Sequence, residues 1–149
     1  NEVYPAQAGW LSLQNPFDFL NYDQPFAPTA QRFEPGVFNT MGVMAAIPTL
    51  EMMLEIGIEA IEQKILRNSQ FLIQLLQEKG YKIYGSTVEK HLSGIVTFYH
   101  PRAEELFPYL KTQQVFVSLR DGKIRVSPHF YNDESDLQTF MEKVKKFDE

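Results

Sequence analysis

The sequence predicts an α+β domain: a small antiparallel or mixed sheet of about four strands with helices packed on it, preceded by an extended leader and a long pair of helices. Three observations predict this class. Apolar residues recur at helical spacing over two long stretches, short apolar stretches of strand type follow them, and Asp121-Gly122 separates the last two of these. Elements in this order build a sheet with helices on it.

Composition excludes several function classes. The chain has 149 residues, of which 44% are hydrophobic, so it can bury a core without disulfides or metal. It has no cysteine, which excludes thiolate zinc sites and a cysteine nucleophile, and its three scattered histidines predict no metal site. A net charge of −5 argues against nucleic acid or an anionic membrane as partner. Its longest nearly apolar run, Met41–Ile47, is too short to span a membrane.

Residues 1–38 are expected to form an extended segment docked on a larger surface. This stretch holds five of the nine prolines and no apolar period of helical length, yet it is rich in aromatic residues. Residues 1–56 carry one basic and six acidic residues, whereas the remainder is balanced. The chain starts at Asn1 without a methionine or a signal-peptide pattern. We therefore expect a piece of a longer cytoplasmic protein, with residues 39–149 as its C-terminal small domain.

Two helices are expected next. Asn39 or Thr40 can cap the first, which runs to about Glu55 and contains Pro48, a residue expected to kink it. Its apolar residues lie on more than one side, which predicts burial against a core, a second domain or a second subunit. The second helix is expected over residues 58–79, because apolar residues line one face and Gly80 suits a left-handed C-cap.

The rest of the chain alternates between strands and helices. Strands are expected at residues 81–84, 94–99, 115–119 and 123–127. Pro101 suits the first position of a short helix, and Asn132 suits the cap of a last helix whose first turn is acidic. Asp121-Gly122 predicts a tight turn between the last two strands.

That turn fixes the register of the final hairpin. Leu119 is expected opposite Ile124 and Val117 opposite Val126, which makes one face apolar. The other face then carries Ser118 opposite Arg125, with two further cations, Arg120 and Lys123. Such a face is either an anion site for a carboxylate or phosphate, or an ordinary solvated surface. The spacing alone favours the solvated surface.

Two stretches favour the anion site. Residues 32–40 (RFEPGVFNT) and 122–132 (GKIRVSPHFYN) closely resemble motifs in the C-terminal part of class V, fold-type-I pyridoxal-phosphate (PLP) enzymes. This superfamily includes alanine–glyoxylate-type aminotransferases, cysteine desulfurases, kynureninase and isopenicillin-N-epimerase-like proteins. Residues 8–12 (AGWLS) resemble the segment that follows the cofactor lysine in the epimerase-like branch. The resemblance spans nearly the whole chain and is carried by the order and spacing of its motifs.

The resemblance implies roles for particular residues. Arg125 would bind the α-carboxylate of an amino-acid substrate, and Arg120 would lie near it. Gly36, Asn39 and Thr40 would contribute donors to the cofactor phosphate, as a helix N-terminus does. Relatives usually have a threonine after the motif glycine, and Val37 stands there instead. His129 lies within the second motif, but nothing assigns it a catalytic role.

The resemblance also implies that the chain is incomplete as an enzyme. The lysine that anchors PLP, the aspartate for its pyridinium nitrogen and the group stacked on its ring lie upstream of the AGWLS-like segment in this superfamily. The lysines present here suit solvated positions, so the fragment is expected to be inactive alone while its parent is a homodimeric PLP enzyme. The lack of cysteine argues against a desulfurase. We favour an aminotransferase- or epimerase-like reaction; the resemblance does not specify the amino acid or the bond that is broken.

Two other readings stay open on the residues alone. One is a stand-alone α+β module that binds a small carboxylate on the face with Arg120, Lys123 and Arg125. The other is a structural domain whose apolar helix mediates assembly. An upstream large domain in the parent reading frame would exclude the stand-alone module.

Overall fold

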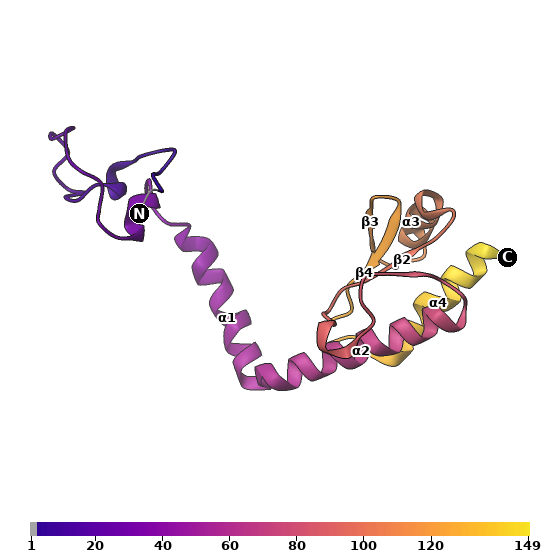
Figure 1. The fold of residues 1–149 in the computed structure, drawn as a ribbon. Helices are drawn as coiled ribbons and strands as arrows, with labels where there is room; N and C mark the ends of the chain where they lie inside the picture. Colours follow the sequence, from indigo (N-terminus) through magenta and orange to yellow (C-terminus); the bar gives the residue numbers. More distant parts are fainter. Residues whose placement is uncertain (1–2) are drawn as a thin grey trace. The chain divides into compact units, whose positions relative to one another are not determined.

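A computed structural model describes residues 3–149 and shows two compact units, the first ending at Met52 and the second comprising Met53–Glu149 (Figure 1). Residues 1 and 2 of the predicted extended segment 1–38 lie outside the described residues. The assignment of residues 1–38 to a link with a further domain, and of 39–149 to a small domain, stays a prediction.

Residues 3–39 of the first unit are mostly irregular chain. Its regular elements are two short 3-10 helices, η1 (Trp10–Ser12) and η2 (Ala30–Phe33), and a single antiparallel bridge between Leu13 and Phe26. The Ser12 side chain is fully buried, accepting from the Gly9 N–H at 3.1 Å and donating to the Glu34 carbonyl at 3.2 Å. This hydroxyl therefore connects η1 to the chain that follows η2 by a hydrogen bond.

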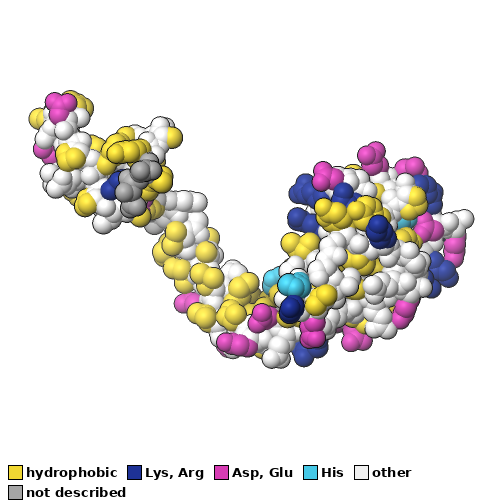
Figure 2. All heavy atoms as spheres, viewed as in Figure 1, with side chains coloured by type: hydrophobic (Ala, Val, Ile, Leu, Met, Phe, Trp, Pro, Cys, Tyr) yellow, Lys and Arg dark blue, Asp and Glu magenta, His cyan; other side chains and the backbone are white. Residues whose placement is uncertain are grey.

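Helix α1 (Thr40–Ile56) leads out of this segment. The Asn39 side chain caps it, since its Oδ1 accepts from the Gly42 N–H at 3.0 Å, and the helix runs through Pro48 without interruption. None of its residues is buried in the described part of the chain, so the core does not cover it, and the expected burial against a second domain or a second subunit stays a prediction. Figure 2 shows hydrophobic side chains along it, and the most exposed of them are Met41, Val43, Met44, Leu50 and Leu54. Helix α1 thus presents an apolar surface.

Helix α2 (Ile58–Glu78) follows Gly57, whose φ of 92° breaks the helical run. Apolar residues on one face of α2 pack into the core, and two buried polar residues, Asn68 and Ser69, share that face. In the described residues no single helix is both long and apolar enough to cross a membrane; only α1 and α2 counted together, across a sharp bend, would meet those criteria.

The sheet contains four antiparallel strands in the order β1-β2-β4-β3. The strands are β1 (Ile83–Tyr84), β2 (Val96–Tyr99), β3 (Ser118–Arg120) and β4 (Lys123–Val126), each shorter than the sequence predicts. The turn is as predicted, with positive φ at Asp121 and Gly122, and Leu119 and Ile124 are opposite one another. Val117, however, has no partner in the ladder. The strand starts later than predicted because the residues after α3 cap the C-terminus of that helix, where the Val115 N–H donates to the Leu110 carbonyl.

Three helices cover the sheet face that carries Ile124 and Val126. They are α2, α3 (Ala103–Thr112) and α4 (Glu134–Asp148), and their apolar residues form one core with the sheet. Its fully buried apolar residues are Leu72, Leu76, Phe98, Leu106, Leu110, Ile124 and Val144. The opposite face of the sheet, here called the open face, carries the alternate residues of each strand.

Two predicted helix starts are wrong by one or two residues. Arg102, not Pro101, immediately precedes α3, so the proline lies outside the helix. Asp133, not Asn132, caps α4: its Oδ1 accepts from the Asp136 N–H at 3.0 Å, which completes a capping box. Asn132 instead accepts from the His129 N–H at 3.0 Å, and so closes the loop before the helix.

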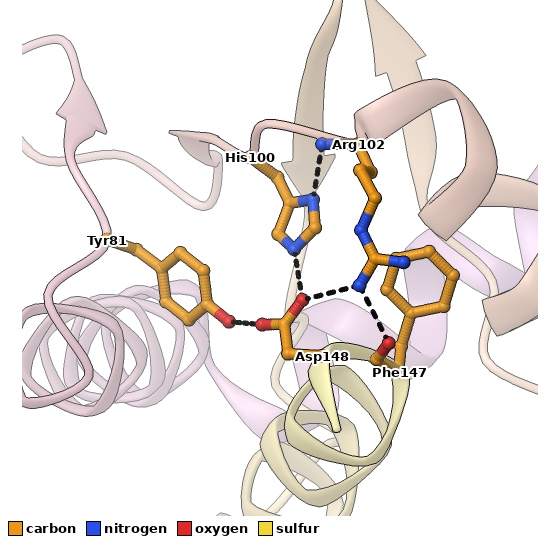
Figure 3. A network of polar contacts seen from close by, with 5 residues as sticks. All are labelled: Tyr81, His100, Arg102, Phe147 and Asp148. Carbon is orange, nitrogen blue, oxygen red and sulfur yellow. Dashed lines mark hydrogen bonds and ion pairs between the residues drawn. The ribbon is translucent and has the colours of Figure 1, made fainter.

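A polar network around the buried His100 ring joins the end of α4 to the segments next to β1 and β2 (Figure 3). The His100 ring accepts the Arg102 N–H at Nδ1 and therefore donates from Nε2 to Asp148 Oδ1 at 3.0 Å. The Tyr81 hydroxyl donates to the other Asp148 oxygen, and Arg102 donates to the Phe147 carbonyl at 2.9 Å while lying over its ring. Burial raises the pKa of Asp148, but the hydrogen bonds from Tyr81 and His100 outweigh it, so the pKa is lowered overall.

Replacing Asp148 with asparagine is expected to lower the free energy of unfolding by about 1–2 kcal/mol at neutral pH. The asparagine side chain keeps the shape of aspartate, but its NH₂ group would face a hydrogen-bond donor of Tyr81 or His100. The loss of stability stays limited because the side chain is partly exposed. Because the pKa of Asp148 is lowered in the folded chain, its contribution is present above the ordinary value of 3.8 and is lost as pH falls through the folded value. Denaturant unfolding measured from pH 7 to pH 3 should therefore show the difference in free energy of unfolding between Asp148→Asn and the unmodified chain becoming smaller. A difference that stays constant over this range would contradict the assignment.

Candidate carboxylate-binding face

The open face consists of two rows of side chains across the four strands. The first row is Tyr84, Thr97, Arg125 and Ser118, in the order of the strands, and the second row is Lys82, Tyr99, Lys123 and Arg120. Each row follows from the antiparallel register, since directly opposed residues point to the same side. The predicted pairing of Ser118 with Arg125, and of Arg120 with Lys123, is confirmed.

Arg125 lies between two hydroxyl residues, with Thr97 on β2 and Ser118 on β3 directly opposite it. Its side chain is half-buried, and its Nε is fully buried without a hydrogen-bond partner in the described residues. A guanidinium presents its donors as a planar fork, which fits the two oxygens of a carboxylate. A buried donor of a charged group that lacks a partner costs free energy, and an anion on this face would satisfy it.

The second row concentrates positive charge beside Arg125. Lys123 Nζ donates to the Asp121 carbonyl at 2.8 Å and lies 4.9 Å from the centre of the Tyr84 ring and 5.7 Å from that of Tyr99. Arg120 is exposed, on the same face as Arg125 but in the other row. The structure therefore brings the two predicted substrate residues to one surface, with Lys123 held by aromatic rings next to them.

Asn68 is a functional candidate that the sequence analysis missed. This residue of α2 is 2% exposed, and its Nδ2 donates to the carbonyls of His129 and Asn132, each at 2.9 Å. The next residue, Ser69, donates to the Ser93 carbonyl at 2.8 Å. The hydrogen bonds of Asn68 fix the loop after β4, and the hydrogen bond of Ser69 fixes the loop before β2. A polar residue in the apolar stripe of α2 was the signal available in the sequence.

His129 does not point to a catalytic role. Its Nδ1 is buried and has no hydrogen-bond partner among residues 3–149, and its ring stacks on Tyr131 with centroids 4.9 Å apart. The backbone of His129 is held at both its N–H and its carbonyl, by Asn132 and Asn68. Its described contacts are those of a residue that shapes the loop.

The three residues predicted to contribute to a phosphate site lie together in the first unit. A hollow of about 490 Å³ is lined by residues 33–38 and includes Gly36. Asn39 uses its oxygen to cap α1, which leaves its amide nitrogen as a donor, while the Thr40 N–H and hydroxyl both reach the Phe38 carbonyl. The Asn39 amide nitrogen is a donor of the kind that a phosphate needs, so the set fits this group in chemistry through Asn39, whereas the N–H groups of Thr40, Gly42 and Val43 already donate to Phe38 and Asn39. Within residues 3–149 no group of three or more His, Asp or Glu side chains could hold a metal ion.

Comparison with protein families matches the chain to Aminotransferase class-V over residues 16–140. The curated relatives include an uncharacterized aminotransferase, YcbU, from Bacillus subtilis, which is 26% identical over 140 residues; these cover 94% of this chain and 36% of the relative. A kynureninase from Geobacillus thermodenitrificans is 26% identical over 131 residues, covering 83% of this chain and 30% of the relative. The chain thus spans about a third of the length of the curated relatives it matches.

Solved structures share the fold. An apo cysteine desulfurase from Thermococcus onnurineus matches with a TM-score of 0.80 and 20% identity, over 96% of this chain and 39% of that one. A variant of C-DES, described with glycine covalently linked to PLP, matches with a TM-score of 0.80 and 19% identity, over 96% of this chain and 38% of that one. At these identities the likeness concerns the fold, and it includes nearly all of this chain.

Proposed function

Since the chain belongs to the aminotransferase class-V family, we propose that it is the C-terminal part of a PLP-dependent enzyme that acts on an amino acid. In this proposal residues 39–149, which include the whole second unit, are the small domain, and the open face supplies the arginine that binds the substrate carboxylate. The observation that carries the proposal is Arg125, held between Thr97 and Ser118 with a buried Nε that has no partner in the described residues.

Arg125 would act by orientation. A bidentate pair between its guanidinium and the substrate carboxylate fixes two atoms of the amino acid, and so restricts rotation of the rest of the molecule. Thr97 and Ser118 are the residues paired with Arg125 on the neighbouring strands, and Asn68 fastens the loop that follows β4. The side chain is thus supported on a sheet and is well suited to hold one substrate geometry.

PLP, when bound, would supply the electron sink for the bond cleavage at the substrate Cα. The residues of this chain that would hold its phosphate are Gly36, through the backbone, Asn39, through its amide nitrogen, and Thr40, at the first turn of α1. Val37 is 80% exposed and brings no hydroxyl to that site.

The exposed apolar side chains fit a chain that is covered by further protein. Helix α1 buries none of its residues, and the aromatic rings of Phe17 and Phe19 are 74% and 63% exposed. Exposed apolar surface on this scale marks an interaction site. We propose that a large domain of the same polypeptide covers part of it, and that a second copy of the enzyme in a homodimer covers the rest.

This 149-residue chain should not form a specific covalent adduct with PLP. Its lysines lie on exposed or half-buried positions, such as Lys79, Lys111 and Lys145, rather than in an apolar pocket that favours the neutral amine. Incubation with PLP, borohydride reduction and peptide mass spectrometry should give low, scattered labelling. Stoichiometric labelling of a single lysine would show that the cofactor anchor lies in this chain, and would overturn the assignment of that role to another part of the protein.

A second candidate function rests on the same face. The second unit has a closed core of its own, so its open face can serve as a stand-alone module that binds a small carboxylate. The reading frame that encodes this chain separates the two functions. An upstream large domain with an anchoring lysine supports the enzyme, whereas a frame without one supports the module.

A further inference from the structure

We propose that the second row of the open face binds a second anionic group of the same ligand whose α-carboxylate Arg125 holds. The ligand class is then an amino or 2-oxo dicarboxylic acid. This inference rests on the proposed function and adds the substrate class to it.

The charge of the open face exceeds what one carboxylate needs. The paired positions of the four strands on this side carry Arg120, Lys123 and Arg125, and Lys82 lies beside Tyr99; none of the paired positions is acidic. The ion pairs found in the described residues involve none of these four cations. The whole chain nevertheless has a net charge of −5, so this positive surface is a local concentration.

Lys123 is held where a ligand on the face can reach it. Its ammonium makes one hydrogen bond, to the Asp121 carbonyl, and lies over Tyr84 and Tyr99, whose rings are 5.8 Å apart in an edge-to-face pair. One donor is thus used, which leaves two for an anion. The aromatic contacts restrict the lysine without neutralising its charge, so less side-chain freedom is lost when an anion binds.

The spacing of the two rows suits a short dicarboxylic acid. Lys123 and Arg125 are two residues apart on β4, on the same side, so their Cα atoms are separated by about 7 Å. Long, flexible side chains at that distance can contact the two ends of one small molecule. Arg120, diagonal to Arg125 on β3, can contact the same end as Lys123.

The test is a titration of the 149-residue chain with two acids of equal carbon number, pentanoate and glutarate, followed by NMR of backbone amides and of the Arg125 Nε–H at low ionic strength. Both acids should shift the Arg125 signal. Glutarate alone should shift Lys123, and it should bind about two- to fivefold more tightly, the factor that one partly exposed ion pair contributes. Titrating 2-oxoglutarate and glutamate separately then shows which of the two ligand types is preferred.

Variants distinguish the second anionic subsite at Lys123 from the carboxylate role of Arg125 on which it rests. Lys123→Met should reduce the preference for glutarate, Lys123→Arg should retain it, and Lys111→Met, which changes an exposed lysine on α3, should leave it unchanged. If both acids shift Arg125 with equal affinity and leave Lys123 unmoved, the second anionic subsite is refuted while the carboxylate role of Arg125 stands. If neither acid shifts Arg125, the proposed function fails with it.

Discussion

Replacing Arg125 with alanine in the whole enzyme is expected to weaken amino-acid binding by about 2–5 kcal/mol, which is the cost of removing one member of a buried charge pair. The fork that matches a carboxylate is lost, and no other cation of the first row can replace it, since its neighbours are Thr97 and Ser118. The amino-acid dissociation constant and kcat/KM for the amino-acid half-reaction measure this effect.

Two further variants make that result specific. Arg125→Lys keeps the charge but not the planar fork, and it should recover only part of the lost affinity. Arg67→Ala removes an exposed arginine of α2 and should change neither constant. Wild-type kinetics in Arg125→Ala would remove Arg125 from the substrate site.

The largest loss of stability is expected for Phe98→Ala, at about 3–5 kcal/mol. Phe98 on β2 is fully buried and packs edge-on against Tyr81, with ring centroids 5.4 Å apart, and against Phe140 of α4 at 6.3 Å. Its removal leaves a cavity between the sheet and the last helix, because a close-packed core relaxes only in part. Chemical denaturation of the second unit's transition measures the change.

The matched control is Phe116→Ala. This phenylalanine is 76% exposed, so the same truncation should change the free energy of unfolding by less than about 0.5 kcal/mol. Equal losses for Phe98→Ala and Phe116→Ala would mean that the core does not lie between the sheet and its three helices.

The sequence predicted the elements whose causes are local. Asp121-Gly122 requires positive φ at both positions, and that turn alone sets which residues are opposite each other in the hairpin. The face shared by Arg120, Lys123 and Arg125 follows directly from it. The α+β class and its four strands followed from the spacing of apolar residues in the same way.

Features that depend on distant parts of the chain were not predictable. Asn68 donates hydrogen bonds to His129 and Asn132, which lie 61 and 64 positions later in the chain. His100 is hydrogen-bonded to Asp148, 48 positions later. A single sequence carries no signal for such pairs beyond a polar residue in an apolar stripe. Helix starts were misplaced for a related reason, since both Asn132 and Asp133 are good caps and the His129 loop decides between them.

A crystal structure of the whole enzyme with an amino-acid substrate or inhibitor bound would show directly whether Arg125 binds the substrate carboxylate. We expect both carboxylate oxygens to lie about 2.7–2.9 Å from the Arg125 guanidinium, with Nε as one of the donors. A carboxylate held by other residues, with Arg125 turned toward bulk solvent, would contradict it.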